Sequence, residues 1–166
     1  MNITADSSTL ILMSKTTITR EIYNYIDSVL ISKQVFKEIV EAGKKDNKED
    51  AIIVENLIKE GKIKVKGIKN HKFIKGLITD FKINQGEAEA ITLALQEKTS
   101  LLTDDKECIK ICRVYDIIFI TALSFLVKLV KDKLLDKKIA MIKIDSLKKI
   151  GYYSKDIIED AIRECN

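Results

Sequence analysis

Acidic residues stand at several positions where carboxylates can do chemistry. Asp6 follows the short segment NITA, and the adjacent pair Asp104 and Asp105 follows the apolar segment LLT. These acids therefore lie at the C-terminal ends of predicted strands, where parallel α/β sheets bind their ligands. One aspartate at such a position also serves as the cap of the next helix. The adjacent pair is more than one cap needs.

A second kind of candidate is a carboxylate on the apolar side of a helix. On a helical wheel, Glu87 has four apolar neighbours within about 80°, namely Ala90, Ile91, Ala94 and Leu95. Glu89 lies on the other side of the same helix. Two explanations of Glu87 remain open. It is a functional carboxylate whose burial something compensates, or it is a first-turn acid that interacts with the helix dipole and reaches water.

Glu38 is a similar but weaker case. It lies beside Val35 and Ala42 on a predicted helix over residues 33–42, while Glu41 lies further toward solvent. An acid at the edge of an apolar stripe is usually just exposed to solvent. Glu38 is therefore a candidate functional residue only in combination with the other acids.

Together these acids predict a metal site. Apart from Lys37 and Lys106, the motifs that carry them contain no basic residue, so the acids would repel one another. Mg²⁺ and Mn²⁺ prefer carboxylate oxygens and remove this repulsion, and such ions activate water and stabilise phosphoryl oxygens. We expect four acids to converge at one end of the sheet, with Asp104 in or beside the cluster and Glu41 and Glu89 pointing away. These four are Asp6, Glu38, Glu87 and Asp105.

The elements that must position these acids alternate between short apolar runs and helix-period segments. The predicted strands cover residues 3–5, 29–31, 62–68, 100–103 and 117–120. The predicted helices cover residues 7–14, 19–26, 33–42, 49–60, 71–81, 86–97, 106–115, 121–133, 137–150 and 155–165, with a charged loop at 42–50. This pattern is typical of βα units. We expect a single domain over residues 1–166, a three-layer α/β/α sandwich with a mainly parallel sheet.

Composition narrows the function classes. The chain has 166 residues, of which 46% are hydrophobic and 33% charged, so it is folded rather than disordered. Its apolar runs are too short to span a bilayer, and its N-terminus lacks the basic region of a secretory signal. Three cysteines without framework spacing favour a reduced, cytoplasmic setting. The net charge of +4 says little about partners.

Other chemistry-bearing residues fit ordinary roles better. Cys108 and Cys112 have the spacing of two metal ligands on one helix, but without a partner pair we expect them in the core. His71 is the only histidine, and it belongs to none of the acidic motifs, so a Ser-His-Asp triad is not expected. Many lysines occur in residues 59–82. Two explanations remain open: these lysines contact the phosphates along an RNA backbone, or they form an ordinary solvated surface.

Four motifs in order resemble the PIN-domain family. They are ADSSTLI, VFKEIV, QGEAEAITLA and LLTDDK, and they cover nearly the whole chain. By this resemblance the family's four acids correspond to Asp6, Glu38, Glu87 and Asp105, with Asp104 beside the last. The ending GYYSKDIIEDAI is similar to the tail of one PIN-like subgroup.

The resemblance implies cleavage of RNA phosphodiester bonds with Mg²⁺ or Mn²⁺, by a metal-held water that leaves 5′-phosphate and 3′-hydroxyl ends. Many relatives are toxins paired with an antitoxin protein, and many form homodimers. Two features depart from the family. Ser32 and Lys33 replace the usual proline before the second motif, and Ile109 and Lys110 stand near the usual arginine. Both departures concern substrate positioning more than metal binding.

Two other function classes compete with a nuclease. A catalytically silent PIN-like module would bind RNA or a partner protein, although all four acidic positions are filled. A phosphotransfer receiver or phosphatase would use a strand-end aspartate with lysine and threonine from later strands. Lys106 directly follows the acid pair, which does not fit that arrangement.

Overall fold

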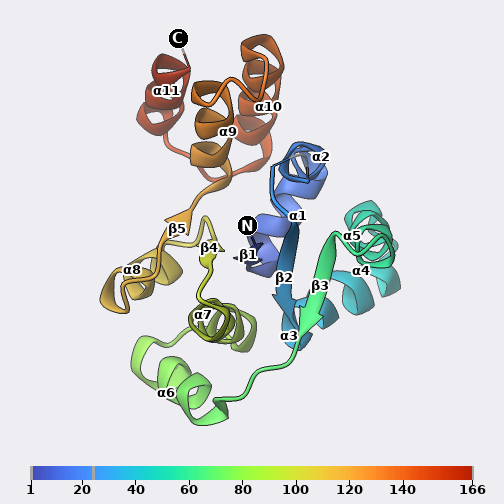
Figure 1. Cartoon of the computed structure of the whole chain (residues 1–166), viewed down its shortest axis with the longest axis vertical. Helices are drawn as coiled ribbons and strands as arrows, with labels where there is room; N and C mark the ends of the chain where they lie inside the picture. The colour runs from blue at the N-terminus through green and yellow to red at the C-terminus, as the bar shows by residue number, and fades with distance from the viewer. Residues whose placement is uncertain (1, 24, 166) are drawn as a thin grey trace.

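Five parallel strands form the central sheet. The computed structural model describes residues 2–23 and 25–165. The strands, in the order β3-β2-β1-β4-β5 (Figure 1), are β1 (Asn2–Ala5), β2 (Ser28–Ser32), β3 (Ile63–Lys66), β4 (Ser100–Leu102) and β5 (Phe119–Ile120). The central strand β1 pairs in parallel with both neighbours, since Thr4 is opposite Leu30 on one side and Leu101 on the other.

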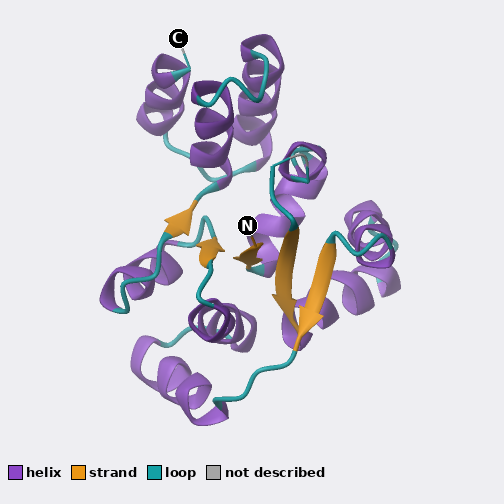
Figure 2. Cartoon of the chain, viewed as in Figure 1, coloured by secondary structure: helices purple, strands orange, loops and turns teal. Residues whose placement is uncertain are grey.

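Helices surround the strands (Figure 2). Before β4 they are α1 (Ser7–Lys15), α2 (Thr19–Ile22), α3 (Lys33–Phe36), the π-helical turn η1 (Lys37–Glu41), α4 (Ala42–Lys45), α5 (Glu49–Lys59), α6 (His71–Phe81) and α7 (Gln85–Glu97). After β4 they are α8 (Lys106–Val114), α9 (Ala122–Lys131), α10 (Lys137–Ile150) and α11 (Lys155–Glu164). None of these helices is both long enough and apolar enough to span a bilayer.

The direction of the connections decides which face each helix covers. From β1 through β2 to β3 the chain moves one way along the sheet, and from β4 to β5 it moves the other way. Because βαβ crossovers are right-handed, α1 and α5 cover one face and α7 and α8 cover the other. Accordingly, α5 packs on α1 and β3, whereas α7 packs on β1, β2, β4 and α8. The predicted three-layer α/β/α arrangement with a parallel sheet is confirmed.

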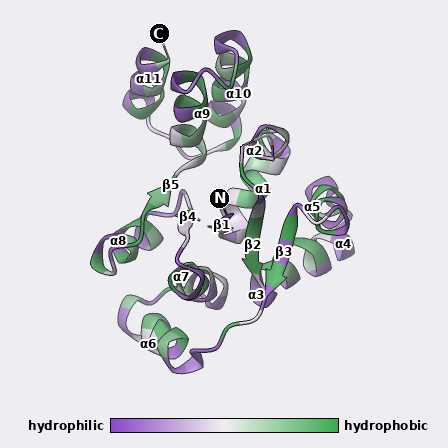
Figure 3. Cartoon of the chain, viewed as in Figure 1, coloured by the Kyte–Doolittle hydropathy of each residue, from purple (hydrophilic) through white to green (hydrophobic). Residues whose placement is uncertain are grey.

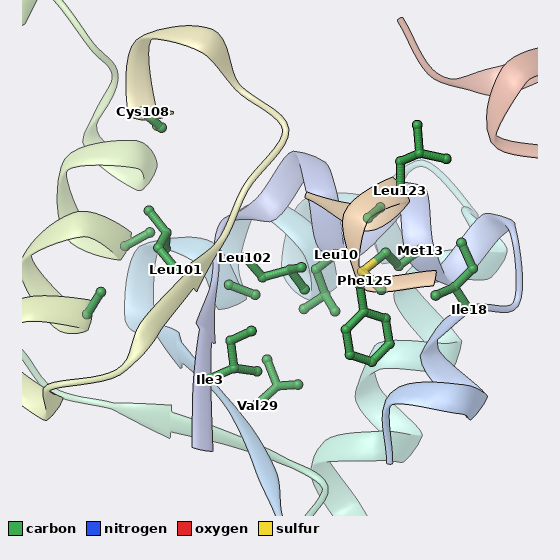
Figure 4. Close-up of a cluster of buried hydrophobic side chains, with 14 of the residues drawn as sticks. Ile3, Leu10, Met13, Ile18, Val29, Leu101, Leu102, Cys108, Leu123 and Phe125 are labelled. Carbon is green, nitrogen blue, oxygen red and sulfur yellow. The ribbon is translucent and has the colours of Figure 1, made fainter. Parts of the chain in front are cut away.

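The core fills both sides of the sheet. All five residues of β2 are buried, and β2 is hydrophobic along its central part in Figure 3. Figure 4 shows Ile3 and Val29 from neighbouring strands beside Leu102, with Leu10 and Met13 of α1 close by. The cysteines of α8, Cys108 and Cys112, are buried in this core, as their apolar surroundings predicted.

The C-terminal helices α9, α10 and α11 pack on one another at one end of the molecule (Figure 1). Lys143 of α10 is buried, and its Nζ donates to the Thr17 carbonyl and hydroxyl oxygens at 3.1 Å each. The same Nζ lies 3.3 Å from Glu21 Oε1. This buried ammonium joins α10 to the segment that follows α1.

The predicted loop over residues 42–50 is wrong at its start. The helix does not end at Gly43 but continues through the π-helical turn and α4 to Lys45. Gly43 is buried, and a Cβ on it would lie 2.7 Å from the Ala51 Cβ. The glycine therefore permits close packing of α4 on α5. Sequence alone treats glycine as a helix end, because it does not show which helix packs against it.

Two apolar runs of the sequence are partly exposed. Ile52 and Ile53 of α5 are exposed, and the helix buries Ala51 and Val54 instead. The predicted strand over residues 117–120 is shortened to the two half-buried residues of the edge strand β5, and Ile118 is 71% exposed. The predicted helix over residues 19–26 contains residue 24, which lies outside the described residues.

Candidate active site

The ends of two neighbouring strands, β1 and β4, are joined through Asp6. Its backbone N–H donates to the Leu102 carbonyl at 3.2 Å. Its Oδ1 accepts from the Thr9 N–H at 2.8 Å, so Asp6 is the N-cap of α1. Its Oδ2 accepts a hydrogen bond from the Thr103 hydroxyl. Both carboxylate oxygens of Asp6 are thus held by groups of the protein itself.

Asp6 is almost completely buried, with 2% of its surface exposed. Burial raises the pKa of its carboxyl group to about 6, because the charged form loses its hydration. The hydrogen bonds from Thr103 and Thr9 oppose this rise, and the charge of Asp104 adds to it. A buried carboxylate that titrates near neutrality at a strand end is typical of functional sites.

Asp105 occupies the first position before α8. Its Oδ1 accepts from the Cys108 N–H at 2.8 Å, which makes it the N-cap of that helix. Its own N–H donates to Thr103 Oγ1 at 3.2 Å. Thr103 therefore links Asp6 to Asp105 through one hydroxyl group.

Glu87 lies in the first turn of α7, where it forms a capping box with Asn84. The Asn84 side chain accepts from the Glu87 N–H at 2.8 Å, and Glu87 Oε2 accepts from the Asn84 N–H at 3.0 Å. Burial raises the pKa of the half-buried Glu87 carboxyl group, and the charges of Asp105 and Glu38 raise it further. Asp105 and Glu38 therefore each lie within electrostatic reach of Glu87.

The π-helical turn carries Glu38. Gln34 Nε2 donates to Glu38 Oε1 at 3.1 Å. The carboxylate rests on the start of α7, since a Cβ on Gly86 would lie 2.5 Å from each of its oxygens. A residue larger than glycine at position 86 would displace this carboxylate. π-helical turns inside helices occur frequently at functional sites.

The Cys108 thiol connects Asp6 to this group of acids. Burial raises the pKa of the thiol, and so do the charges of Asp6, Asp105 and Glu87. Asp6, Asp105 and Glu87 thus each act on this one thiol, while Glu38 acts on Glu87.

Asp104 has a different position from its neighbour Asp105. Its Oδ1 accepts from the Tyr153 hydroxyl at 2.6 Å, and its Oδ2 accepts from the Ala122 N–H at 3.2 Å. Its own N–H donates to Thr9 Oγ1 at 2.8 Å. Burial is the main cause that raises the pKa of this carboxyl group. The structure directs Asp104 toward α9 and the segment between α10 and α11.

Glu89 lies beside the candidate site and accepts hydrogen bonds from two glutamines. Its Oε2 accepts from the Gln34 N–H at the start of α3 at 3.2 Å, and its Oε1 accepts from Gln85 Nε2 at 2.7 Å. We expected Glu89 to point away, but its carboxylate contacts Gln34, the residue that donates to Glu38. Glu41, on the same turn as Glu38, is exposed.

Sequence reasoning missed the polar residues that hold the acids, among them Thr9, Gln34 and Tyr153. The only sequence signal for Thr9 is its position three residues after a cap aspartate. Tyr153 is part of the GYYS tail noted above, but its contact with Asp104 joins residues 49 positions apart. No local pattern indicates such a contact.

The fold and these motifs agree with a comparison against known families. A family model described as PIN domain matches residues 2–166. The chain belongs to the PIN-domain family. A search of curated proteins finds no relative. PIN domains have a nuclease-type fold, and here Asp6 and Asp105 follow the ends of β1 and β4, while Glu38 and Glu87 lie on η1 and α7.

The acids of this PIN domain fit a hard divalent cation by their chemistry. They supply carboxylate oxygens, the ligands that Mg²⁺ and Mn²⁺ prefer, and their mutual repulsion raises the pKa of Glu87. Among the described residues, however, no three histidine, cysteine, aspartate or glutamate side chains are close enough to form a ready-made metal site. The donors are present, and a cation would have to draw them closer.

Proposed function

We propose that this PIN domain is a metal-dependent endoribonuclease. The observation that carries the proposal is the crowding of acids around Glu87: the Glu38 carboxylate lies over the adjacent Gly86, and after burial the charges of Asp105 and Glu38 add to the raised pKa of Glu87. The buried Asp6 stands at the end of β1. Keeping several acids in one neighbourhood costs free energy unless a cation compensates their charge.

The proposed ligands of Mg²⁺ or Mn²⁺ are Asp6, Glu38, Glu87 and Asp105. When bound, such an ion activates a water for attack on phosphorus and neutralises charge on the phosphoryl oxygens. The chain's own residues orient these ligands: Thr103 holds Asp6 and Asp105, and Gln34 holds Glu38. We place Asp104 beside this set rather than in it, because its carboxylate oxygens accept hydrogen bonds from the C-terminal part of the chain, from Tyr153 and Ala122.

RNA is the proposed substrate, and exposed lysines near the sheet edge support it. Lys64 on the edge strand β3 is exposed, as are Lys69 before α6 and Lys72 in its first turn. Lysine is a flexible point charge that suits phosphate backbones rather than base edges. A role as the toxin of a toxin–antitoxin pair, in the cytoplasm and as a homodimer, is a finer proposal, tested by co-purification with the product of the adjacent gene and by light scattering.

One observation favours the second candidate, a silent binding module. Both oxygens of Asp6 already accept hydrogen bonds within the protein, from Thr9 and Thr103. A carboxylate satisfied in this way can hold two loops together without binding a metal. Cleavage separates the two candidates, because a silent module binds RNA without breaking it.

The test is a cleavage assay with purified protein, a set of unstructured and hairpin RNAs, and Mn²⁺. We expect cleavage that stops with EDTA and leaves 5′-phosphate ends. Asp105→Asn should lower the rate at least about 100-fold, because it removes a ligand charge while keeping the side-chain shape. The matched control is Glu41→Gln, an exposed acid on η1, which should cleave as the wild type does.

Equal cleavage by the wild type and Asp105→Asn would contradict the proposed site. RNA binding without cleavage by either protein would select the silent module.

A further inference from the structure

The C-terminal part of the chain reaches the candidate site through one side chain. Tyr153 lies between α10 and α11, and its hydroxyl donates to Asp104 Oδ1 at 2.6 Å. Asp104 directly precedes Asp105, the N-cap of α8. A hydrogen bond to a carboxylate is stronger than one between neutral groups. This contact therefore acts on the loop that presents one of the proposed metal ligands.

The backbone next to Tyr153 is shaped for this contact. A Cβ on Gly151 would lie 2.6 Å from Tyr153 Cε2 and 2.8 Å from the Leu147 carbonyl oxygen. Only glycine leaves the ring room to fold back over the end of α10. The neighbouring Tyr152 is fully exposed, so the two adjacent tyrosines have opposite environments.

Three other hydrogen bonds hold the loop that follows β4. The Asp104 N–H donates to Thr9 Oγ1 in α1 at 2.8 Å, and Asp104 Oδ2 accepts from the Ala122 N–H at the start of α9 at 3.2 Å. The Asp105 N–H donates to Thr103 Oγ1 at 3.2 Å. Of these hydrogen-bonding groups, only the Tyr153 hydroxyl belongs to the segment after α10. Its hydrogen bond to Asp104 depends on where the tyrosine ring lies.

We propose that Tyr153 is a positioning residue, which holds Asp104 as a latch so that the next residue, Asp105, faces Glu87. In this arrangement Asp104 is an acceptor for the latch and not a metal ligand. The C-terminal helices α10 and α11 then complete the candidate site of the preceding α/β sandwich. The catalytic part of this inference rests on the proposed nuclease function.

The first test compares Tyr153→Phe with Tyr152→Phe. The loss of the Tyr153 hydroxyl leaves Asp104 Oδ1 without its donor. We expect about tenfold faster hydrogen exchange at the Asp104 and Asp105 amides. We also expect kcat for RNA cleavage to fall about tenfold or more, since small displacements of reacting groups have such effects. KM should be unchanged, because the phenol contacts no substrate, and Tyr152→Phe should match the wild type in every measurement.

The second test displaces the ring without removing its hydroxyl. Gly151→Ala places a methyl group against Tyr153 and should reproduce the effects of Tyr153→Phe. The matched control is Gly76→Ala on α6, where nothing lies within 4 Å of the added methyl group. That control should keep full activity and unchanged exchange at the β4–α8 loop.

The third test separates a latch from a ligand. Asp104→Asn should lower Mn²⁺ affinity only a few-fold, in line with Tyr153→Phe, whereas Asp105→Asn should abolish binding. Equal abolition by Asp104→Asn and Asp105→Asn would make Asp104 a ligand and overturn the latch.

Unchanged loop exchange in Tyr153→Phe would also overturn the latch, as would full activity despite a loosened loop. If the wild type cleaves no RNA with Mn²⁺, the proposed function fails. The latch is then judged by loop exchange alone, where faster exchange in Tyr153→Phe supports it.

Discussion

Asp6 shows how one residue serves both the fold and the candidate site. It caps α1, joins β1 to β4 and remains buried, and burial raises the pKa of its carboxyl group to about 6 from a model-peptide value near 4. The folded state therefore binds its proton more tightly than the unfolded state does. Between about pH 4 and pH 6 this difference makes the folded state less stable as the pH rises.

Asp6→Asn should accordingly stabilise the protein at pH 7. The amide keeps the cap to Thr9 and can donate to Thr103, so it removes the buried charge without removing the contacts. The expected gain in the free energy of unfolding is about 3 kcal/mol at pH 7, and it should vanish as the pH falls to 4. Urea unfolding of both proteins across this range measures it. A variant that is less stable at pH 7, or a difference independent of pH, would contradict this account.

At the residue scale, the sequence singles out candidate acids but not the residues that hold them. The helical wheel placed Glu87 among apolar residues, and the structure has it half-buried with its pKa raised. The helical wheel could not predict what Glu89 contacts, because its partner Gln34 belongs to another helix. Nor could it distinguish Asp104 from Asp105, since both follow the same strand. Their difference depends on Tyr153 and Ala122, which are distant in sequence.

At the scale of elements, the contact between η1 and α7 matters most for the candidate site. Glu38 lies on the π-helical turn, and its carboxylate rests where a side chain at position 86 would otherwise be. The sequence predicts the helix over residues 33–42 but not its π-helical turn, which depends on how the chain packs. The glycine before Glu87 is visible in sequence, but the carboxylate that needs its space is not.

Gly86→Ala should separate stability from function. The added methyl group meets only the flexible end of Glu38, so the carboxylate moves away and the helices remain in place. Alanine is also the better helix former, by up to about 1 kcal/mol. We therefore expect unchanged or slightly raised stability in thermal unfolding, with RNA cleavage reduced about tenfold or more.

The control for this variant is again Gly76→Ala, which gains helix propensity in open space and should keep full activity. If Gly86→Ala cleaved RNA normally, the position of Glu38 would not matter for the reaction. If it unfolded the protein, the contact would be a rigid packing contact rather than a movable carboxylate.

At the scale of the whole molecule, the sheet order explains why distant acids meet. β1 and β4 are paired in parallel although almost a hundred residues separate them in sequence. The residues that follow the two strands therefore lie together at the C-terminal ends of the strands. Alternating strands and helices predicted this sheet from sequence. The attachment of the C-terminal helices could not be predicted, because it depends on single long-range contacts such as Lys143 with Thr17 and Tyr153 with Asp104.

The most direct test of the central claim is a Mn²⁺ titration of the wild type, Glu87→Gln and Glu41→Gln, followed by free Mn²⁺ in electron paramagnetic resonance. Glu87 is the carboxylate whose pKa is raised by both Asp105 and Glu38, while Glu41 is exposed. We expect saturable binding by the wild type and Glu41→Gln, and affinity at least about tenfold weaker for Glu87→Gln, which loses a ligand charge. Equal affinity in all three proteins, or no saturable binding by the wild type, would contradict it.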